Sequence, residues 1–199
     1  MSDYTPSAAE VKTVREITGA GLMDCKRALA EVQGSVDEAV KLLRERGIAK
    51  AAKRADRSTS EGVVDAYIHG GGRIGVLVEV GCETDFVANT NDFRHFAHEI
   101  ALQVSANPET RWVSRDDVPA DLVEAELDIY LAQAADKPEQ VQDRIAKGKL
   151  DKWLEGVCLL EQPYIRDGDR TIEEMRAALA AETGENIQIK RFARFERGR

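Results

Sequence analysis

Two histidines and two carboxylates lie close together near the middle of the chain, and these are side chains that bind divalent metals. Asp92, His95, His98 and Glu99 fall within one stretch that we expect to be helical. Zinc-binding histidine pairs on a helix follow the order HExxH, with a glutamate directly after the first histidine. Here the histidines are three residues apart and Phe96 follows the first. We therefore predict no metal and no cofactor. A metal-dependent hydrolase remains an alternative that would require stoichiometric metal.

Other residues that could carry out chemistry also lack the necessary spacing. Cys25, Cys82 and Cys158 form no CxxC pair, and we interpret them as reduced thiols. The run of glycines at 70–72 lacks the Lys-Ser/Thr ending of a phosphate-binding loop, which favours a hairpin loop. No pairing of a nucleophile with a base can be identified from the sequence.

The overall charge favours a protein partner. The chain of 199 residues has a formal net charge of -8, whereas nucleic acids and anionic membranes attract cationic surfaces. One basic stretch nevertheless keeps nucleic-acid binding open as an alternative to a solvated helix and linker. Its members are Lys41, Arg44, Arg46, Lys50, Lys53, Arg54 and Arg57. Binding through phosphates would weaken steeply as salt is added, which would distinguish the two interpretations.

No targeting or membrane segment is expected. The first four residues have neither a basic start nor an apolar stretch behind them, and the densest apolar run, at 74–80, is far shorter than the ~20 residues of a spanning helix. We therefore predict a cytoplasmic protein.

The elements that must position any functional residue begin with three short helices. Helical spacing joins Val11, Val14 and Ile17 in the first of them. Glycines at 19 and 21 separate it from the second, which carries Leu22, Cys25, Leu29 and Val32. Ser35 and Glu38 form a candidate capping box for the third, and Gly47 fits its end. We assign residues 1–48 to this module and 49–60 to a helical or flexible linker.

A second domain is predicted over residues 61–199. Runs rich in β-branched residues at 61–68 and 73–82 predict a hairpin across the glycines at 70–72. A helix follows, with one apolar face that consists of Phe93, Phe96, Ala97, Ile100, Ala101 and Val104.

The remaining elements complete an α+β fold. Pro119 and Pro138 begin two helices that we expect to form an antiparallel pair over about 119–160, with a possible break at Gly148. Val123, Leu127, Tyr130, Leu131 and Ala134 form the apolar side of the first. A helix from Thr171 to near Gly184 and a terminal strand through Ile189 and Phe195 follow, which gives a three-stranded antiparallel sheet.

Two stretches resemble the signature segments of translation elongation factor Ts. They are TGAGLMDCKRAL at 18–29 and ETDFVA at 83–88. The hairpin at 67–80, the stretch LLEQPY at 159–164 and the tail from GENI at 184–187 to 191–192 are similar to family sequence and follow the family order. The resemblance covers essentially the whole chain.

This resemblance implies a non-enzymatic guanine nucleotide exchange factor whose partner is the GTPase EF-Tu. It implies that residues 1–48 are a ubiquitin-associated-like (UBA-like) module that packs on the nucleotide-binding domain of EF-Tu. The positions that it carries over as contacts in this module are Val14, Gly19, Gly21, Leu22 and Met23. The chain would then have no small-molecule substrate of its own and would bind neither nucleic acid nor membrane.

The second signature implies the action on the nucleotide site. Thr84, Asp85, Phe86 and Val87 match the family segment that reaches toward the Mg²⁺ and phosphate side of bound GDP, with Asp85 and Phe86 as the working pair. Without the resemblance, Phe86 would be interpreted as a core residue at a strand-to-helix turn and Asp85 as a helix cap. Leu22 and Met23 have the same alternative as core residues of the module.

The chain resembles the short form of the family. Longer members contain two copies of the hairpin-plus-helix core, whereas this chain has one copy followed by the helical pair. We therefore predict a homodimer that supplies the second core surface, with the terminal strand as the shared edge. Charged residues in place of Ile189 and Phe195 are expected to separate it.

Overall fold

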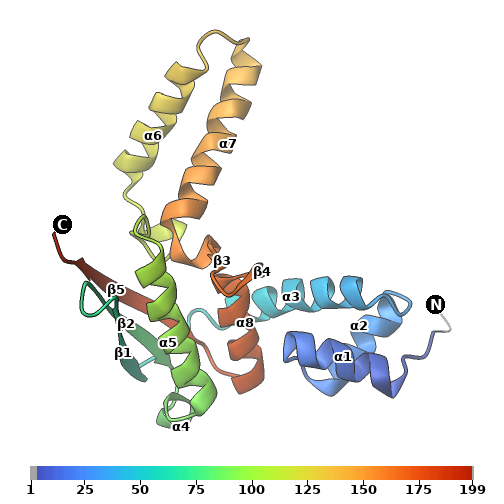
Figure 1. Ribbon diagram of the computed structural model, residues 1–199. Coiled ribbons are helices and arrows are strands. Elements are labelled where there is room, and N and C mark those ends of the chain that lie inside the picture. Colours follow the sequence, from blue (N-terminus) through green and yellow to red (C-terminus); the bar gives the residue numbers. More distant parts are fainter. Residues whose placement is uncertain (1–3, 199) are drawn as a thin grey trace. The chain divides into compact units, whose positions relative to one another are not determined.

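The computed structural model describes residues 4–198 and has the predicted mixed α and β composition. The first three residues of the predicted module and the last residue of the predicted second domain lie outside the described residues. The chain begins with the three expected helices (Figure 1), which are α1 (Ala8–Thr18), α2 (Leu22–Glu31) and α3 (Val36–Ala52).

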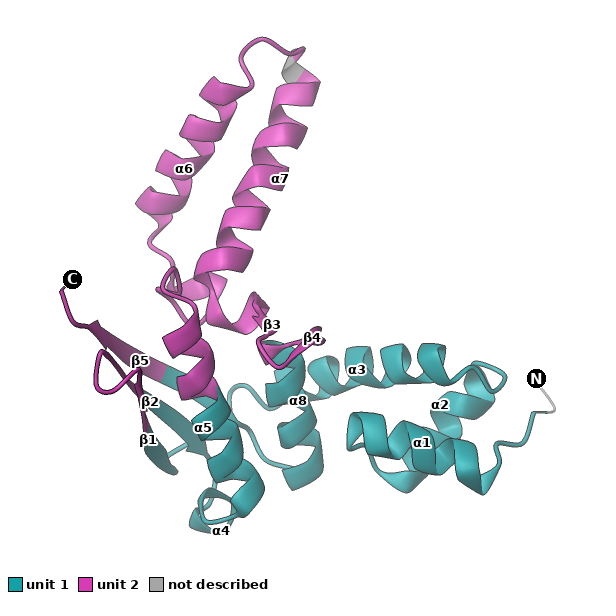
Figure 2. Ribbon diagram, in the orientation of Figure 1, with its two compact units in different colours: residues 1–65, 78–99, 173–190 teal, residues 66–77, 100–172, 191–199 magenta. Residues whose placement is uncertain are grey.

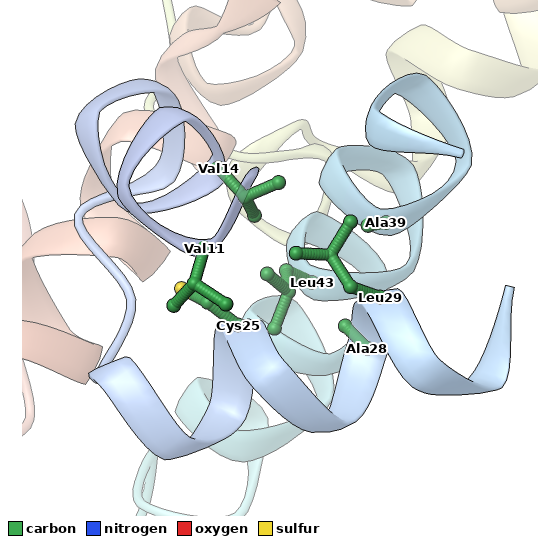
Figure 3. Packing of buried hydrophobic residues seen from close by; sticks show 7 residues of the cluster. All are labelled: Val11, Val14, Cys25, Ala28, Leu29, Ala39 and Leu43. Atoms are coloured by element: carbon green, nitrogen blue, oxygen red, sulfur yellow. The ribbon is translucent and has the colours of Figure 1, made fainter. Parts of the chain in front are cut away.

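Local capping and a small apolar core explain these three helices. The hydroxyl of Ser7 accepts a hydrogen bond from the Glu10 N–H at 3.3 Å, and the Glu10 carboxylate accepts one from the Ser7 N–H at 2.7 Å. Gly19 ends α1 in the left-handed conformation, with φ 67°. Small and branched side chains from all three helices pack against one another (Figure 3); they are Val11, Val14, Cys25, Ala28, Leu29, Ala39 and Leu43.

The expected end of the third helix at Gly47 was wrong. Helix α3 continues to Ala52, and its next N–H, that of Lys53, donates to the Ala49 carbonyl. A glycine inside a helix costs only about 1 kcal/mol relative to alanine, and the alanines that follow Gly47 favour the helical state. The segment predicted as a linker therefore begins as helix.

A three-stranded antiparallel sheet forms the β part of the fold, in the order β1-β2-β5. Its strands are β1 (Glu61–His69), β2 (Ile74–Cys82) and β5 (Gln188–Glu196). The glycines between β1 and β2 have φ values of 60°, 67° and 84°, which a residue with a Cβ rarely adopts. A further two-stranded sheet, not anticipated from the sequence, joins β3 (Pro163–Tyr164) to β4 (Asp167–Thr171).

Helix α5 (Asn91–Ala106) lies over one face of the three-stranded sheet (Figure 1). Its predicted apolar face is buried throughout, with no member more than 5% exposed. The one-turn helix α4 (Asp85–Ala88) connects β2 to α5, and α8 (Ile172–Thr183) begins directly after Thr171, as expected. Because β2 is part of the sheet and ends at Cys82, its end determines where α4 begins, at Asp85.

The helical pair consists of α6 (Ala120–Gln133) and α7 (Glu139–Val157). Helix α7 runs through Gly148 without a break, and a short 3₁₀ turn (Leu159–Glu161) follows it. The apolar side of α6 is only half-buried along the helix, because a two-helix hairpin covers one side of each helix, whereas Ala134, just after its end, is buried. Trp112 and Trp153 meet edge to face at the base of α7, with ring centroids 6.1 Å apart.

The chain divides into two compact units (Figure 2). Unit 1 comprises residues 1–65, 78–99 and 173–190, and unit 2 comprises residues 66–77, 100–172 and 191–199. Unit 1 contains α1 to α4 and most of α8, and unit 2 contains the helical pair. In the part of the chain that the structure describes, none of the helices combines the length and the apolar character that crossing a membrane requires.

Candidate functional site

The candidate site begins two residues after the end of β2 and consists of Thr84, Asp85, Phe86 and Val87. We call it the exchange segment, after the role that the family resemblance implies for it. Thr84 is extended, with φ -127° and ψ 154°, and its hydroxyl accepts a hydrogen bond from the Val87 N–H at 3.4 Å. Threonine is a favourable N-cap because its oxygen satisfies an N–H of the first turn. Capping therefore falls to Thr84, and Asp85 is the first residue of α4.

The side chains of this segment differ sharply in exposure. Phe86 is 81% exposed, the largest fraction among the exposed large apolar side chains of the described residues. Asp85 is also exposed, whereas Thr84 and Val87 are half-buried. The alternative interpretation of Phe86 as a core residue was therefore wrong. A phenyl ring and a carboxylate stand next to each other in solvent on a one-turn helix.

A carboxylate far along the chain holds the beginning of this segment. Glu185 accepts hydrogen bonds from the N–H groups of Glu83 and Thr84, at 2.9 and 3.1 Å, and from the Thr84 hydroxyl at 2.6 Å. Sequence reasoning included Glu185 only as part of the family-like tail and assigned it no role. No local signal could have identified it, because its partners are about a hundred residues away in sequence.

The turn between α1 and α2 presents a second candidate surface. Leu22 and Met23 are 55% and 61% exposed, so they are not core residues of the module. Gly19 and Gly21 shape the turn, as the C-cap of α1 and the N-cap of α2. Ile17, which its spacing placed on the buried face of α1, is instead 44% exposed and adds to the apolar surface that flanks the turn.

One of the residues predicted as contacts in this region does not lie at the surface of the free protein. Val14 is completely buried within the core of the three helices (Figure 3). A side chain in this position packs α1 against α2 and α3 and is covered in the free protein. Val14 therefore belongs to the support of the surface rather than to the surface.

The histidines do not assemble into a metal centre in the described part of the chain. His98 Nδ1 lies 2.9 Å from the Asp65 carboxylate of β1. Among the described residues, no group of three or more His, Cys, Asp or Glu side chains has an arrangement that could hold a metal ion. The His98–Asp65 contact links α5 to the sheet.

The basic stretch forms many contacts within unit 1. Arg46 pairs with Glu31 at 2.6 Å, Lys50 with Asp24 at 3.3 Å, and Arg57 with Glu83 at 3.2 Å. Two more members reach α8, where Arg44 lies 4.0 Å from Glu174 and Arg54 donates to the Ala180 carbonyl. Much of the positive charge in this stretch, on which the nucleic-acid alternative was based, therefore has a partner within the protein.

A cavity of about 270 Å³ lies beside this stretch. Its walls come from α2, α3, the residue Arg54 and the end of α8, and Arg27, Arg46 and Lys50 are among its lining residues. Arg27 pairs with Asp24 on the same wall, so acidic and basic groups face the cavity together. Arg46 and Lys50 on the same walls pair with Glu31 and Asp24, and Arg54 donates to the Ala180 carbonyl, so each of these basic side chains has an acceptor within the protein.

The three cysteines are buried, free thiols. Burial raises the pKa of Cys82 and of Cys158 to about 11, and it also raises the pKa of Cys25. A thiol with so high a pKa stays protonated at neutral pH and is a poor nucleophile. They therefore contribute apolar packing.

Comparison with known proteins shows similarity to elongation factors Ts. The profile of the family described as "Elongation factor TS" matches residues 5–199. The elongation factor Ts of Caldanaerobacter subterraneus subsp. tengcongensis is 55% identical over 195 residues, which are 96% of this chain and 96% of that protein. That of Thermoanaerobacter sp. (strain X514) is 54% identical, over 96% and 95% of the two chains. That of Desulforamulus reducens is 51% identical, over 96% and 89%.

Proposed function

This chain belongs to the elongation factor Ts family, and we propose that it is a guanine nucleotide exchange factor that promotes GDP release from EF-Tu during translation elongation. It acts in the cytoplasm as a binding protein and not as an enzyme. The exchange segment approaches the Mg²⁺ and phosphate side of the nucleotide site, and the three N-terminal helices, as a UBA-like module, dock on the nucleotide-binding domain. The observation that carries this proposal is the exposure of Phe86 beside Asp85.

Exchange requires a large difference in binding free energy. For GDP bound at about 1 nM with an association rate near ~10⁶ M⁻¹s⁻¹, dissociation would occur at about 10⁻³ s⁻¹, far below synthesis at ~5–20 residues per second. A factor of about 10⁴ corresponds to ~5.5 kcal/mol of preference for the state with a disrupted nucleotide site. One surface ion pair contributes only ~0–1 kcal/mol, so apolar burial must supply most of it.

Phe86 is suited to that requirement. A phenylalanine side chain buries on the order of 150 Å², which at about 25 cal/mol per Å² corresponds to roughly 4 kcal/mol before ordering costs. Because the ring is 81% exposed in the free protein, nearly all of this area is available for a partner. The gain appears only when a cleft opens to receive the ring, which makes binding selective for the disrupted nucleotide site.

Asp85 adds a negative charge next to the ring. A carboxylate in that place can attract the N-terminus of a helix in EF-Tu, or it can compete for the polar groups that hold Mg²⁺. Both actions would weaken GDP binding, because they draw away the groups that hold its phosphates and the Mg²⁺ ion.

The N-terminal turn supplies docking area away from the nucleotide. Leu22 and Met23 expose apolar side chains from the start of a rigid helix, with Gly19 and Gly21 holding the turn. Docking here keeps the exchange segment near its target whether or not nucleotide is present.

The test is release of a fluorescent GDP analogue from EF-Tu, followed by stopped flow. Phe86→Ala should lower the release rate by roughly 30-fold or more, because truncating such an aromatic anchor typically costs ~2 kcal/mol or more. The fold should be unaffected, since the ring is exposed.

A matched control is Ile165→Ala, which truncates another exposed apolar side chain, 51% exposed, in unit 2. This control should release GDP at the wild-type rate. Normal release with Phe86→Ala would refute the role of the ring, and no release with the wild-type protein would refute the function.

We also propose that the protein acts as a homodimer. Three exposed apolar side chains project from the sheet strands of unit 2, one from each strand; they are Ile68, Leu77 and Phe195. One of the two residues expected in the dimer contact is not available for it. Ile189 is only 6% exposed and belongs to the core of its own protomer, so the contact would rest on the exposed residues and not on Ile189.

A further inference from the structure

The base of the exchange segment is held by two glutamates from distant parts of the chain. Glu185 uses both carboxylate oxygens, one on the N–H groups of Glu83 and Thr84 and the other on the Thr84 hydroxyl. In return, the Glu83 carboxylate accepts a hydrogen bond from the Asn186 N–H at 2.6 Å. Each segment thus places a side-chain carboxylate on the backbone of the other. All of these residues belong to unit 1.

A third segment closes the arrangement. Arg57 lies 3.2 Å from Glu83, and the Asn186 amide donates to the carbonyl oxygens of Ala55 and Arg57 at 3.1 and 2.9 Å. Three segments therefore meet next to the start of the exchange segment. They are the end of the segment predicted as a linker, the end of β2 and the chain after α8. We call this group the carboxylate clamp and define it as Arg57, Glu83, Glu185 and Asn186.

The clamp acts on the exposed pair through Thr84. The Thr84 hydroxyl donates to Glu185 and accepts from the Val87 N–H, so one oxygen connects the clamp to the first turn of α4. A helix of four residues cannot stabilise itself, because nucleating a single turn is unfavourable. The direction of the bonds that carry Asp85 and Phe86 therefore depends on a support outside α4.

Such support matters for binding. A side chain that samples many orientations loses conformational entropy when a partner immobilises it, and a preorganised one loses less. Phe86 has little of its own protein to hold it, since 81% of it is exposed. Its backbone sets the direction of the bond from Cα to Cβ, and the clamp holds the start of that backbone through Glu83 and Thr84.

We propose that Glu185 is a positioning residue for nucleotide exchange, which holds the exchange segment so that Phe86 and Asp85 meet the nucleotide site in one orientation. This inference rests on the function proposed above. Glu185 acts through Thr84, to which both of its carboxylate oxygens are hydrogen-bonded.

The experiment measures GDP release from EF-Tu over a range of concentrations of the full chain. Glu185→Ala should lower the maximal release rate by about tenfold, the effect of losing roughly one charge-assisted hydrogen bond. The half-saturating concentration should stay within about twofold of wild type, because the docking surface of the N-terminal helices is intact. Partial misfolding would instead raise the half-saturating concentration and leave the maximal rate unchanged.

The matched control is Glu182→Gln, which removes a charge from an exposed position on α8. It should leave both parameters unchanged. If Glu185→Ala unfolds, Glu185→Gln serves as the second variant, because its amide keeps an acceptor for Thr84 while its NH₂ group opposes the backbone N–H donors. Hydrogen exchange of the amides at 84–88 should then be faster than in wild type, with little change elsewhere.

A double-mutant cycle decides whether the clamp works through the ring. In the Phe86→Ala background, Glu185→Ala should change the maximal rate by less than about twofold, because only Asp85 is left to position and the ring supplies most of the proposed gain. Equal effects in both backgrounds, or a normal maximal rate with Glu185→Ala, would overturn the proposal. If the wild-type protein promotes GDP release from EF-Tu and the Glu185 variants promote it at the same maximal rate, the positioning role of Glu185 is refuted and the proposed function stands.

Discussion

The Glu83 carboxylate is held in its charged form by the groups around it. The N–H of Asn186 donates to it and the Arg57 guanidinium lies beside it, and together they lower the pKa of Glu83 from its ordinary value against an opposing effect of desolvation. The side chain is 25% exposed, so solvent screens part of this interaction. The charge state of this one side chain is therefore linked to the stability of unit 1.

This linkage predicts the pH dependence of stability. A carboxyl group whose pKa is lower in the folded protein binds protons more readily in the unfolded chain, so its stabilisation is present above its unfolded pKa. That stabilisation is lost as the pH falls through the folded pKa. Glu83→Gln should lower the free energy of unfolding by about 1 kcal/mol at neutral pH and flatten its decrease in the acid range.

Urea unfolding of the two proteins from neutral pH down to about pH 4 measures the effect. Glu182→Gln, on the exposed side of α8, provides the control and should keep the wild-type profile. Parallel curves for wild type and Glu83→Gln would show that Glu83 contributes nothing to the acid sensitivity.

Helix α7 contains a glycine in its interior and continues through it without a break. The helix runs from Glu139 to Val157 with Gly148 near its middle, where an added Cβ would meet no atom within 4 Å. Glycine has no packing role there, and it costs the helix more backbone entropy than alanine does. The neighbouring turns are strong enough to continue through it.

Gly148→Ala should therefore stabilise the protein, by about 0.5–1 kcal/mol. The comparison is Gly184→Ala, just beyond the end of α8, where φ is 77° and an alanine is strained even though space is available. That substitution should lower the stability by about 1 kcal/mol. Thermal or urea unfolding gives both values. The same sign for the two variants would contradict this account of the two glycines.

For the molecule as a whole, the distribution of charge and apolar surface favours protein partners. The formal net charge is -8, and much of the basic stretch pairs with acidic groups or carbonyls within unit 1. Exposed apolar side chains, in contrast, occur on the exchange segment, on the turn after α1 and on the sheet strands of unit 2. Exposed apolar surface of this kind is typical of protein contacts.

The homodimer should depend on the exposed residues of unit 2. Phe195→Asp, at a position that is 68% exposed, should separate the dimer without unfolding the protomer and should reduce GDP release. Ile165→Asp introduces the same charge at an exposed position outside the three-stranded sheet and should leave the dimer intact. Light scattering gives the mass of each protein. A fully active wild-type monomer would refute the dimer.

Much of the fold could be read from the order of residues. The candidate site at 83–88 was identified only through the family resemblance and stays a prediction. Among the features of the fold, helical spacing predicted the buried face of α5, and the glycines at 70–72 predicted the hairpin. These features succeed because they depend on neighbours a few residues apart, where the periods of helix and strand are expressed directly. The end of α3 was misjudged because the penalty for one glycine is small compared with the preference of the alanines that follow.

Exposure and long-range support were decided only by the tertiary structure. Val14 and Ile17 fall on the same predicted face of α1, yet one is completely buried and the other is 44% exposed, because the other two helices cover only part of that face. Glu185 reaches Thr84 across about a hundred residues, and no local pattern encodes such a pairing. It follows from the tertiary fold of unit 1, which brings distant carboxylates and backbone N–H groups within hydrogen-bonding distance.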